Sequence, residues 1–248
     1  MSKVVTVFGV KVRVLSSRAA LEGIKELLAK GGAHSLFFVN AHTLNLAYED
    51  PEYREVLNSA DLVLNDGIGV EIAARLFGVS FPENLVGTDF IPKLCALSQD
   101  LSLSLYLLGS RPGVAEMAAT RLQASFPGLE VVGTHHGYFS KEEEDEVIRA
   151  IREASPDILL VGFGNPLQEK WIVRHQGELG VPLCVGVGAF IDFAAGQVRR
   201  APHWARRARM EWLLRLILEP RRLWRRYVLG NPKFLWRVFR ARLSTTGK

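Results

Sequence analysis

Asp66 stands in the segment Asn65-Asp66-Gly67-Ile68-Gly69, directly after an apolar run that is typical of a strand. A carboxylate at the end of such a strand faces the ligand crevice of a parallel sheet, and the glycines let a substrate approach the backbone. The functional hypothesis is a general base or a hydroxyl-binding carboxylate. The structural alternative is an N-cap for the next helix. Position alone leaves both open.

A second candidate site is the segment 162–171, where Gly-Phe-Gly-Asn-Pro opens a predicted helix. A Gly-x-Gly turn at a helix start suits an anion, although most such turns are simply tight turns. Gln168 falls in the first helical turn, where it can reach a bound sugar; the alternative is solvation on the surface. The spacing G-x-G-x-x-G is missing, which weakens the hypothesis of a nucleotide-dependent oxidoreductase.

Metal ligands are not predicted. His135 and His136 are adjacent, and neighbours on a strand point to opposite faces. No Asp-x-Asp pair is present to hold a metal on a nucleotide diphosphate. If the protein handles a diphosphate, cationic side chains must neutralise it. No cofactor is expected.

The cations gather at the C-terminus. Residues 199–248 hold 15 Lys and Arg, two acids and four of the five tryptophans, so a body of formal charge −8 carries a tail of +13. Arg matches phosphate oxygens, and indoles prefer the boundary between apolar and wet phases. The tail therefore indicates a diphosphate, an anionic membrane or a nucleic acid.

The elements that must position these residues alternate between strands and helices. Expected strands include 35–39, 61–64, 103–108, 129–132, 157–161 and 182–185, with a hairpin around Gly9 and polar turns such as 40–43 at the strand ends. This order predicts an α/β fold, with a Rossmann-like, largely parallel sheet and helices on both faces. We expect a catalytic domain over 1–198 and a helical basic appendage over 199–248.

The appendage is predicted as three helices. One runs over 203–218; the next begins at Pro220, shows Arg222, Arg225 and Arg226 on one face, and ends at Asn231-Pro232; a last basic helix follows. No apolar run approaches the ~18 residues of a membrane span, and no signal peptide is evident. The expected location is the cytoplasm, with peripheral membrane contact. Exposed tail tryptophans also suggest a homo-oligomer.

Taken together, the motifs resemble those of the WecG/TagA/CpsF family of glycosyltransferases, from about residue 5 to residue 234. The marks are Asn40-Ala41, Asn65-Asp66-Gly67-Ile68-Gly69, Gly87-Thr88-Asp89, Leu107-Leu108-Gly109, the segments 133–139 and 162–171, Gly186-Val187-Gly188, Arg200-Ala201-Pro202, Glu211-Trp212 and Glu219-Pro220. Single members are weak signals, but their order and spacing are specific.

The resemblance implies an inverting, metal-independent transfer from a UDP-sugar to a sugar on a polyprenyl diphosphate, at the inner face of the bacterial membrane. It makes Asp66 the catalytic base. It implies substrate-binding roles for Asn40, Thr43, Gly67, Gly109, Gly137, Tyr138, Gly164, Gln168, Arg215, Arg222 and Arg225. The three arginines would hold the diphosphate.

One departure concerns the donor. The teichoic-acid branch has Thr-Pro before Asn-Ala, whereas this chain has Phe38-Val39, with Thr43 nearby. The run 40–45 is more similar to the exopolysaccharide branch, so the donor stays open between UDP-glucose and UDP-N-acetylmannosamine or its uronic acid. The alternative from another class is a nucleic-acid-binding protein using the basic tail, which the acidic body disfavours.

Overall fold

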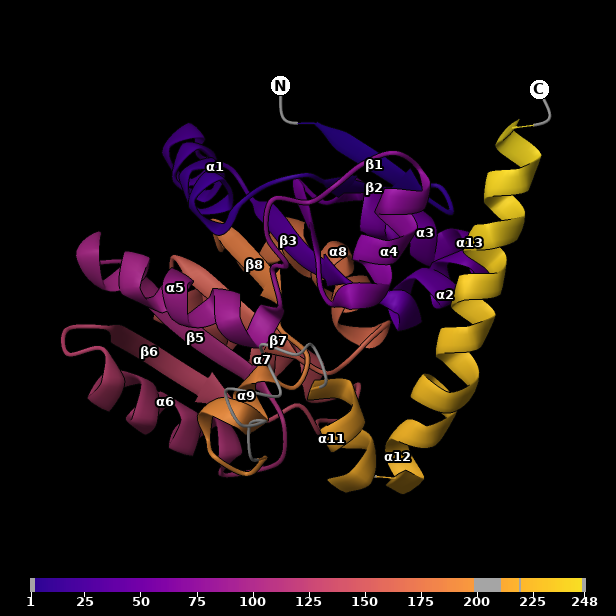
Figure 1. Ribbon diagram of the computed structural model, residues 1–248. Coiled ribbons are helices and arrows are strands. Elements are labelled where there is room, and N and C mark those ends of the chain that lie inside the picture. Colours follow the sequence, from indigo (N-terminus) through magenta and orange to yellow (C-terminus); the bar gives the residue numbers. More distant parts are fainter. Residues whose placement is uncertain (1–2, 199–210, 219, 247–248) are drawn as a thin grey trace.

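The computed structural model describes residues 3–198, 211–218 and 220–246 and is built around a six-stranded parallel sheet (Figure 1). The strand order is β4-β3-β8-β7-β5-β6, and every neighbouring pair is parallel. The strands are β3 (His34–Val39), β4 (Leu62–Asn65), β5 (Ser104–Gly109), β6 (Glu130–His135), β7 (Ile158–Gly162) and β8 (Leu183–Gly186). The predicted α/β class is confirmed.

Helices cover both faces of the sheet, because the strands are apolar on both. Leu36 and Phe38 of β3 pack in one buried cluster, and Phe37 and Val39 pack in the other. The helices of the body are α1 (Ser17–Lys30), α2 (Ala41–Glu49), α3 (Pro51–Ser59), α4 (Ile68–Leu76), α5 (Gly87–Asp100), α6 (Val114–Ser125), α7 (Glu144–Ala154), α8 (Leu167–Leu179) and α9 (Phe190–Ala194). Because both faces of these strands are buried, their sequences are continuous apolar runs and do not alternate between apolar and polar residues.

The predicted hairpin forms a separate two-stranded sheet. Its strands β1 (Val4–Val7) and β2 (Val10–Arg13) are antiparallel and joined by two residues. Phe8 and Gly9 both have positive φ, as a two-residue hairpin turn with the twist of its strands requires. The valines of its inner face belong to the same buried cluster as Phe37.

The polar turn predicted at 40–43 is instead the start of helix α2. Asn40 is its N-cap, and its side-chain oxygen accepts from the backbone N–H groups of His42 (3.0 Å) and Thr43 (3.2 Å). The Thr43 hydroxyl oxygen in return accepts from the Asn40 N–H at 2.6 Å. This reciprocal capping satisfies the free donors of the first turn, so the helix begins directly after β3.

The described part of the appendage comprises α11 (Glu211–Leu218), α12 (Pro220–Trp224), a π-helical turn η1 (Arg225–Leu229) and α13 (Gly230–Thr246). The predicted break at Asn231-Pro232 is wrong. Both residues lie in the first turn of α13, which follows η1 directly. The last two predicted helices are therefore continuous through the π turn.

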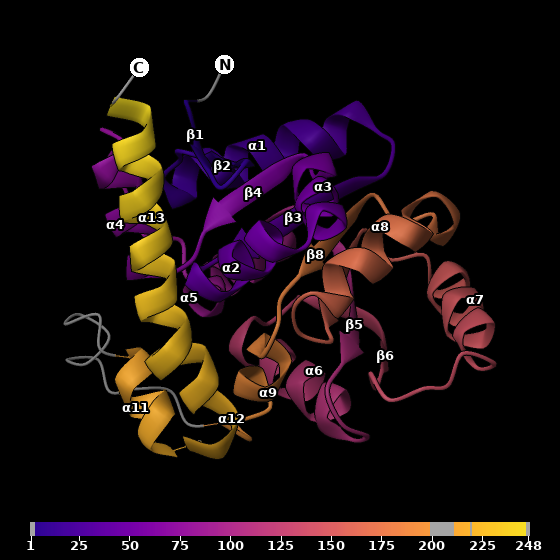
Figure 2. The same ribbon diagram turned by 90° about the vertical axis from the view of Figure 1, so that its right-hand side faces the viewer.

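Helix α13 packs against α2 and α4 of the body (Figure 2). Phe234, only 1% exposed, and Val238 belong to the body's buried cluster, and Phe234 meets Phe8 edge to face. Asn45 donates from its side chain to the Gly230 carbonyl at 2.8 Å, and Arg237 pairs with Glu49 at 2.5 Å. The appendage is thus joined to the body by apolar burial and by charge.

Candidate functional site

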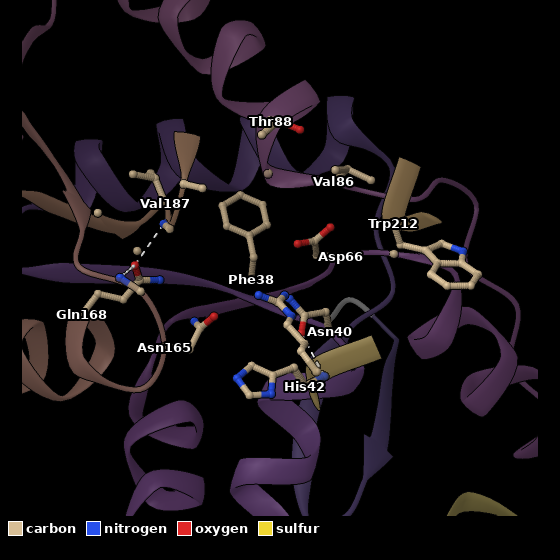
Figure 3. Close-up of a pocket in the computed structure, with 18 of the residues that line it drawn as sticks. Phe38, Asn40, His42, Asp66, Val86, Thr88, Asn165, Gln168, Val187 and Trp212 are labelled. Carbon is tan, nitrogen blue, oxygen red and sulfur yellow. Dashed lines mark hydrogen bonds between the residues drawn. The ribbon is translucent and has the colours of Figure 1, made fainter. Parts of the chain in front are cut away.

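A wide cleft of about 1710 Å³ lies where the strands of the sheet end. Each of the six strands contributes residues from its C-terminal end or the loop after it, as expected of a parallel α/β sheet. Residues of the appendage also line the cleft, and Figure 3 labels Trp212 among them. The appendage residues that line the cleft come from α11, η1 and α13 and include Trp212, Leu213, Leu216, Arg226, Tyr227, Phe234 and Leu235.

Asp66 lies in this cleft, directly after β4, and Figure 3 shows its carboxylate between Phe38 and Val86. Its backbone N–H donates to the Val39 carbonyl at 2.8 Å, which ties the ends of β3 and β4 together. The N-cap position of α4 belongs to Gly67, which has a φ of 93° and no side-chain cap. The capping alternative for Asp66 is therefore not realised, and Asp66 lines the cleft.

Gln168 is among the residues that line the cleft, but its amide already makes hydrogen bonds within the protein. The side chain is 2% exposed, and its oxygen accepts from the backbone N–H groups of Gly164 (3.2 Å) and Gly188 (2.9 Å). These two glycines follow β7 and β8, so Gln168 joins two loops of the cleft wall. Gly186 allows this, because a Cβ there would stand 2.9 Å from the Gln168 amide nitrogen. The surface alternative for Gln168 is wrong.

A buried carboxylate, Glu169, lies behind Gln168. It accepts from the Gln168 amide, the Asn165 amide and the Tyr53 hydroxyl. Burial raises the pKa of Glu169 to about 7, and the hydrogen bonds from Gln168 and Asn165 oppose that rise. A carboxyl that titrates near neutrality therefore sits next to the cleft wall.

This carboxyl makes stability depend on pH. Its pKa in the folded protein lies above the unfolded value of 4.5, so its favourable contribution is complete below pH 4.5 and is lost as pH rises through about 7. We expect Glu169→Gln, which cannot ionise, to gain stability relative to the wild type between pH 5 and pH 8, by roughly 3 kcal/mol at most. Urea unfolding of both proteins at several pH values measures the difference. A difference that does not change with pH would contradict the raised pKa.

Seven of the predicted residues line the cleft: Asn40, Asp66, Gly67, Gly137, Tyr138, Gly164 and Gln168. Thr43 and Gly109 do not. Thr43 is buried in its capping role, and Gly109 allows β5 to approach β7, since a Cβ there would lie 2.7 Å from the Gly162 carbonyl oxygen. Arg225 lines a smaller adjoining cavity. The side chains of Arg215 and Arg222 lie outside the part of the chain that the structure describes.

The structure brings Arg226 to the cleft, a residue to which sequence reasoning gave no binding role. The helical spacing in the sequence places Arg226 on one face with Arg222 and Arg225, but it does not predict the π turn at 225–229. A π turn has more residues than an α turn, so it shifts the faces that α spacing predicts, and both Arg226 and Tyr227 line the cleft. Burial, followed by the Arg226 charge, lowers the pKa of His42 to about 4. His42 is therefore neutral at physiological pH.

Sequence reasoning gave no binding role to several further polar groups of the cleft, among them Ser110, Asp192 and Asn165. The Ser110 hydroxyl donates to the Asp192 carboxylate at 2.5 Å, across 82 residues of sequence. No local pattern signals such a pair. Asn165 stood in the Gly-Phe-Gly-Asn-Pro segment, and only the folded arrangement reveals that it reaches the cleft.

The histidine pair differs from expectation. Strand β6 ends at His135, so strand alternation does not extend to His136, and the two rings lie 4.4 Å apart between centroids. Within residues 3–198, 211–218 and 220–246, no three His, Cys, Asp or Glu side chains are grouped as a metal site requires. Nor does any helix in these ranges combine the length and apolar character needed to span a bilayer.

A parallel sheet with a carboxylate after one strand and a wide cleft at the carboxyl ends of all six strands is the arrangement of an α/β enzyme, whose ligands bind at that edge of the sheet. The description "Glycosyl transferase WecG/TagA/CpsF family" belongs to a family model that matches residues 5–248, and the chain is a member of this family. The expected resemblance is confirmed.

Two relatives come from Staphylococcus aureus, strains NCTC 8325 / PS 47 and MRSA252. Each bears the name N-acetylglucosaminyldiphosphoundecaprenol N-acetyl-beta-D-mannosaminyltransferase. Each is 28% identical to this chain over 240 residues, which cover 96% of this chain and 93% of the relative.

Proposed function

We propose that this protein transfers a sugar from a UDP-sugar, with inversion, to a sugar carried on a polyprenyl diphosphate. The observation that carries the proposal is the Asp66 carboxylate at the end of β4, facing a cleft large enough for two substrates. The names of the S. aureus relatives support the acceptor class, N-acetylglucosamine on diphosphoundecaprenol. Neither these names nor the family supports the nucleic-acid alternative.

In the proposed reaction Asp66 acts as the general base. The acceptor hydroxyl oxygen forms a bond to the anomeric carbon while its proton passes to the Asp66 carboxylate. The bond between the anomeric carbon and the phosphate oxygen breaks, and its electron pair leaves with UDP. A single displacement of an α-linked sugar gives a β product, which agrees with the β-D-mannosaminyl transfer in the relatives' name.

Cationic side chains are proposed to stabilise the leaving diphosphate. Arg226 lines the cleft and Arg225 lines the smaller cavity that adjoins it. Negative charge grows on the diphosphate in the transition state, so fixed positive charges there lower the barrier selectively. Arg215 and Arg222 remain proposed partners from the sequence. Lys170 is held by Asp50 and Glu52, which makes it a weaker candidate.

A metal-free mechanism predicts full activity in excess EDTA. The assay mixes the purified protein with UDP-N-acetylmannosamine, UDP-glucose or UDP-N-acetylmannosaminuronic acid and a short-chain polyprenyl-diphosphate N-acetylglucosamine, and measures UDP release and product. We expect transfer from one of these donors and no change on chelation. Loss of activity in EDTA that Mg²⁺ or Mn²⁺ restores would overturn the metal-free part; no transfer from any donor would overturn the proposed function.

We propose that the chain consists of a catalytic domain that ends near residue 198 and an appendage that follows it. The appendage is proposed to hold the cleft at the inner face of the membrane. Apolar side chains on α13, Trp236, Phe239 and Leu243, are exposed beside the exposed Arg240 and Arg242. Apolar burial and charge attraction act together at an anionic bilayer, where each basic residue contributes about 1 kcal/mol. This placement would bring the cleft to a lipid-linked acceptor.

A further inference from the structure

Glu169 has no part in the proposed mechanism, yet it holds together the polar groups behind the cleft wall. Its side chain is 0% exposed. One oxygen, Oε1, accepts from Asn165 Nδ2 at 2.5 Å and from Gln168 Nε2 at 2.7 Å. The other, Oε2, accepts from the Tyr53 hydroxyl at 3.1 Å. Three donors from α3, α8 and the loop after β7 therefore converge on one carboxyl group.

These contacts dictate which way each amide faces. An oxygen without a proton can only accept, so Asn165 and Gln168 must both turn their NH₂ groups toward Oε1. The oxygen of the Gln168 amide supports the same orientation, because it accepts from the backbone N–H groups of Gly164 and Gly188. For Asn165, whose NH₂ group bonds to Glu169, the amide oxygen is left on the side of the cleft. Figure 3 shows the Asn165 oxygen on the cleft side.

We propose that Glu169 is a positioning residue, which orients the amides of Asn165 and Gln168 so that the cleft presents the Asn165 carbonyl oxygen as a hydrogen-bond acceptor. This inference rests on the proposed function for its ligand, a hydroxyl group of the bound donor sugar. With the Asn165 amide reversed, the cleft would present an NH₂ group. That group can donate to the oxygen of a sugar hydroxyl, but the hydroxyl proton would then have no acceptor on the protein. Discrimination by such a site comes from the cost of an unpaired polar group.

The orienting contact survives protonation. If Glu169 carries a proton on Oε2, that proton is donated to the Tyr53 oxygen, while Oε1 remains a carbonyl that accepts from both amides. A glutamine at position 169 reproduces this arrangement with its own NH₂ directed at Tyr53. A methionine has a similar volume and offers no comparable acceptor. Glu169→Gln therefore removes the charge and keeps the acceptor oxygen, whereas Glu169→Met keeps the volume and removes the acceptor oxygen.

The first test measures orientation without any ligand. In protein labelled with ¹⁵N-asparagine, the Asn165 side-chain NH₂, assigned by its disappearance in Asn165→Ala, is expected to exchange slowly with solvent in the wild type and in Glu169→Gln. In Glu169→Met the exchange is expected to become at least about tenfold faster, because the buried acceptor is gone. Equal exchange in the wild type and Glu169→Met would overturn the proposal, whatever reaction the protein catalyses.

The second test asks whether that orientation serves the sugar. We expect Glu169→Met and Asn165→Ala each to raise KM for the UDP-sugar donor about tenfold, the effect of about one hydrogen bond, with a smaller change in kcat. The double variant should be no worse than Asn165→Ala alone, and Glu169→Gln should recover most of the loss. Circular dichroism confirms that each variant is folded.

Additive losses in the double variant, or a fall in melting temperature without a change in KM, would assign Glu169 a purely structural role and overturn the proposal. A wild-type protein that transfers no sugar from any UDP-sugar would instead overturn the proposed function. The exchange measurement still decides the orientation of Asn165 in that case. The two failures are thus distinguishable.

Discussion

Asp66→Asn is expected to lower kcat for sugar transfer by about 10²- to 10⁴-fold, the range that a general base contributes. The substitution keeps the shape of the side chain and removes its ability to take the acceptor's proton. The backbone hydrogen bond from Asp66 to the Val39 carbonyl does not involve the side chain, and the N-cap position of α4 belongs to Gly67. The loop should therefore keep its conformation.

UDP binding, measured by calorimetry, should be unchanged in Asp66→Asn, because the base acts on the acceptor and not on the nucleotide. The pH profile adds a second reading: the rising limb of kcat that reports the base should disappear. Near-normal turnover would remove Asp66 as the base. Loss of UDP binding together with turnover would instead make Asp66 a binding residue.

Removal of the appendage is expected to have a comparably large effect. A chain ending at residue 198 loses Trp212, Leu216 and Arg226 from the cleft wall, along with the proposed leaving-group cations. We expect it to keep its α/β fold, to transfer sugar at least about 100-fold more slowly, and to bind anionic liposomes weakly, since the lost cations are each worth about 1 kcal/mol at the bilayer. A fully active truncated protein would show that the appendage serves only as an anchor.

Two point variants of α13 separate closure of the cleft from attachment to the membrane. Phe234→Ala removes a buried ring and should weaken docking by about 3–5 kcal/mol, lowering activity even with a soluble acceptor. Trp236 is 65% exposed on the same helix, so Trp236→Ala should leave activity with the soluble acceptor intact and reduce liposome flotation. If Phe234→Ala reduced only liposome flotation and Trp236→Ala reduced only activity, the buried face of α13 would serve the membrane and the exposed face the reaction, contrary to this prediction.

Much of the site was predictable because its signals are local. An apolar run followed by Asn-Asp-Gly places Asp66 at a strand end, and parallel topology brings all such ends to one edge of a sheet. The polar composition of Asn-Ala-His-Thr predicts a turn where helix α2 begins, although Asn40 and Thr43 have the spacing of reciprocal caps. The start of α2 is therefore encoded locally, in these two residues.

Other features could not be obtained locally. Gln168 bonds to Gly188, Tyr53 to Glu169 and Ser110 to Asp192, and each pair depends on how distant segments pack. The π turn at 225–229 has no periodic signature, yet it brings Arg226 and Tyr227 together into the cleft.

The sequence by itself determined the α/β class, the family, the place of Asp66 and the basic appendage, because composition, strand runs and ordered motifs are properties of neighbouring residues. Only the tertiary structure decided which arginine of the appendage lines the cleft, which atoms of the Asn165 amide bond to Glu169, and that α13 packs on α2 and α4. The physical reason is that burial and hydrogen bonding are shared between segments far apart in the chain. Their partners are fixed when the chain folds and are not encoded at any one position.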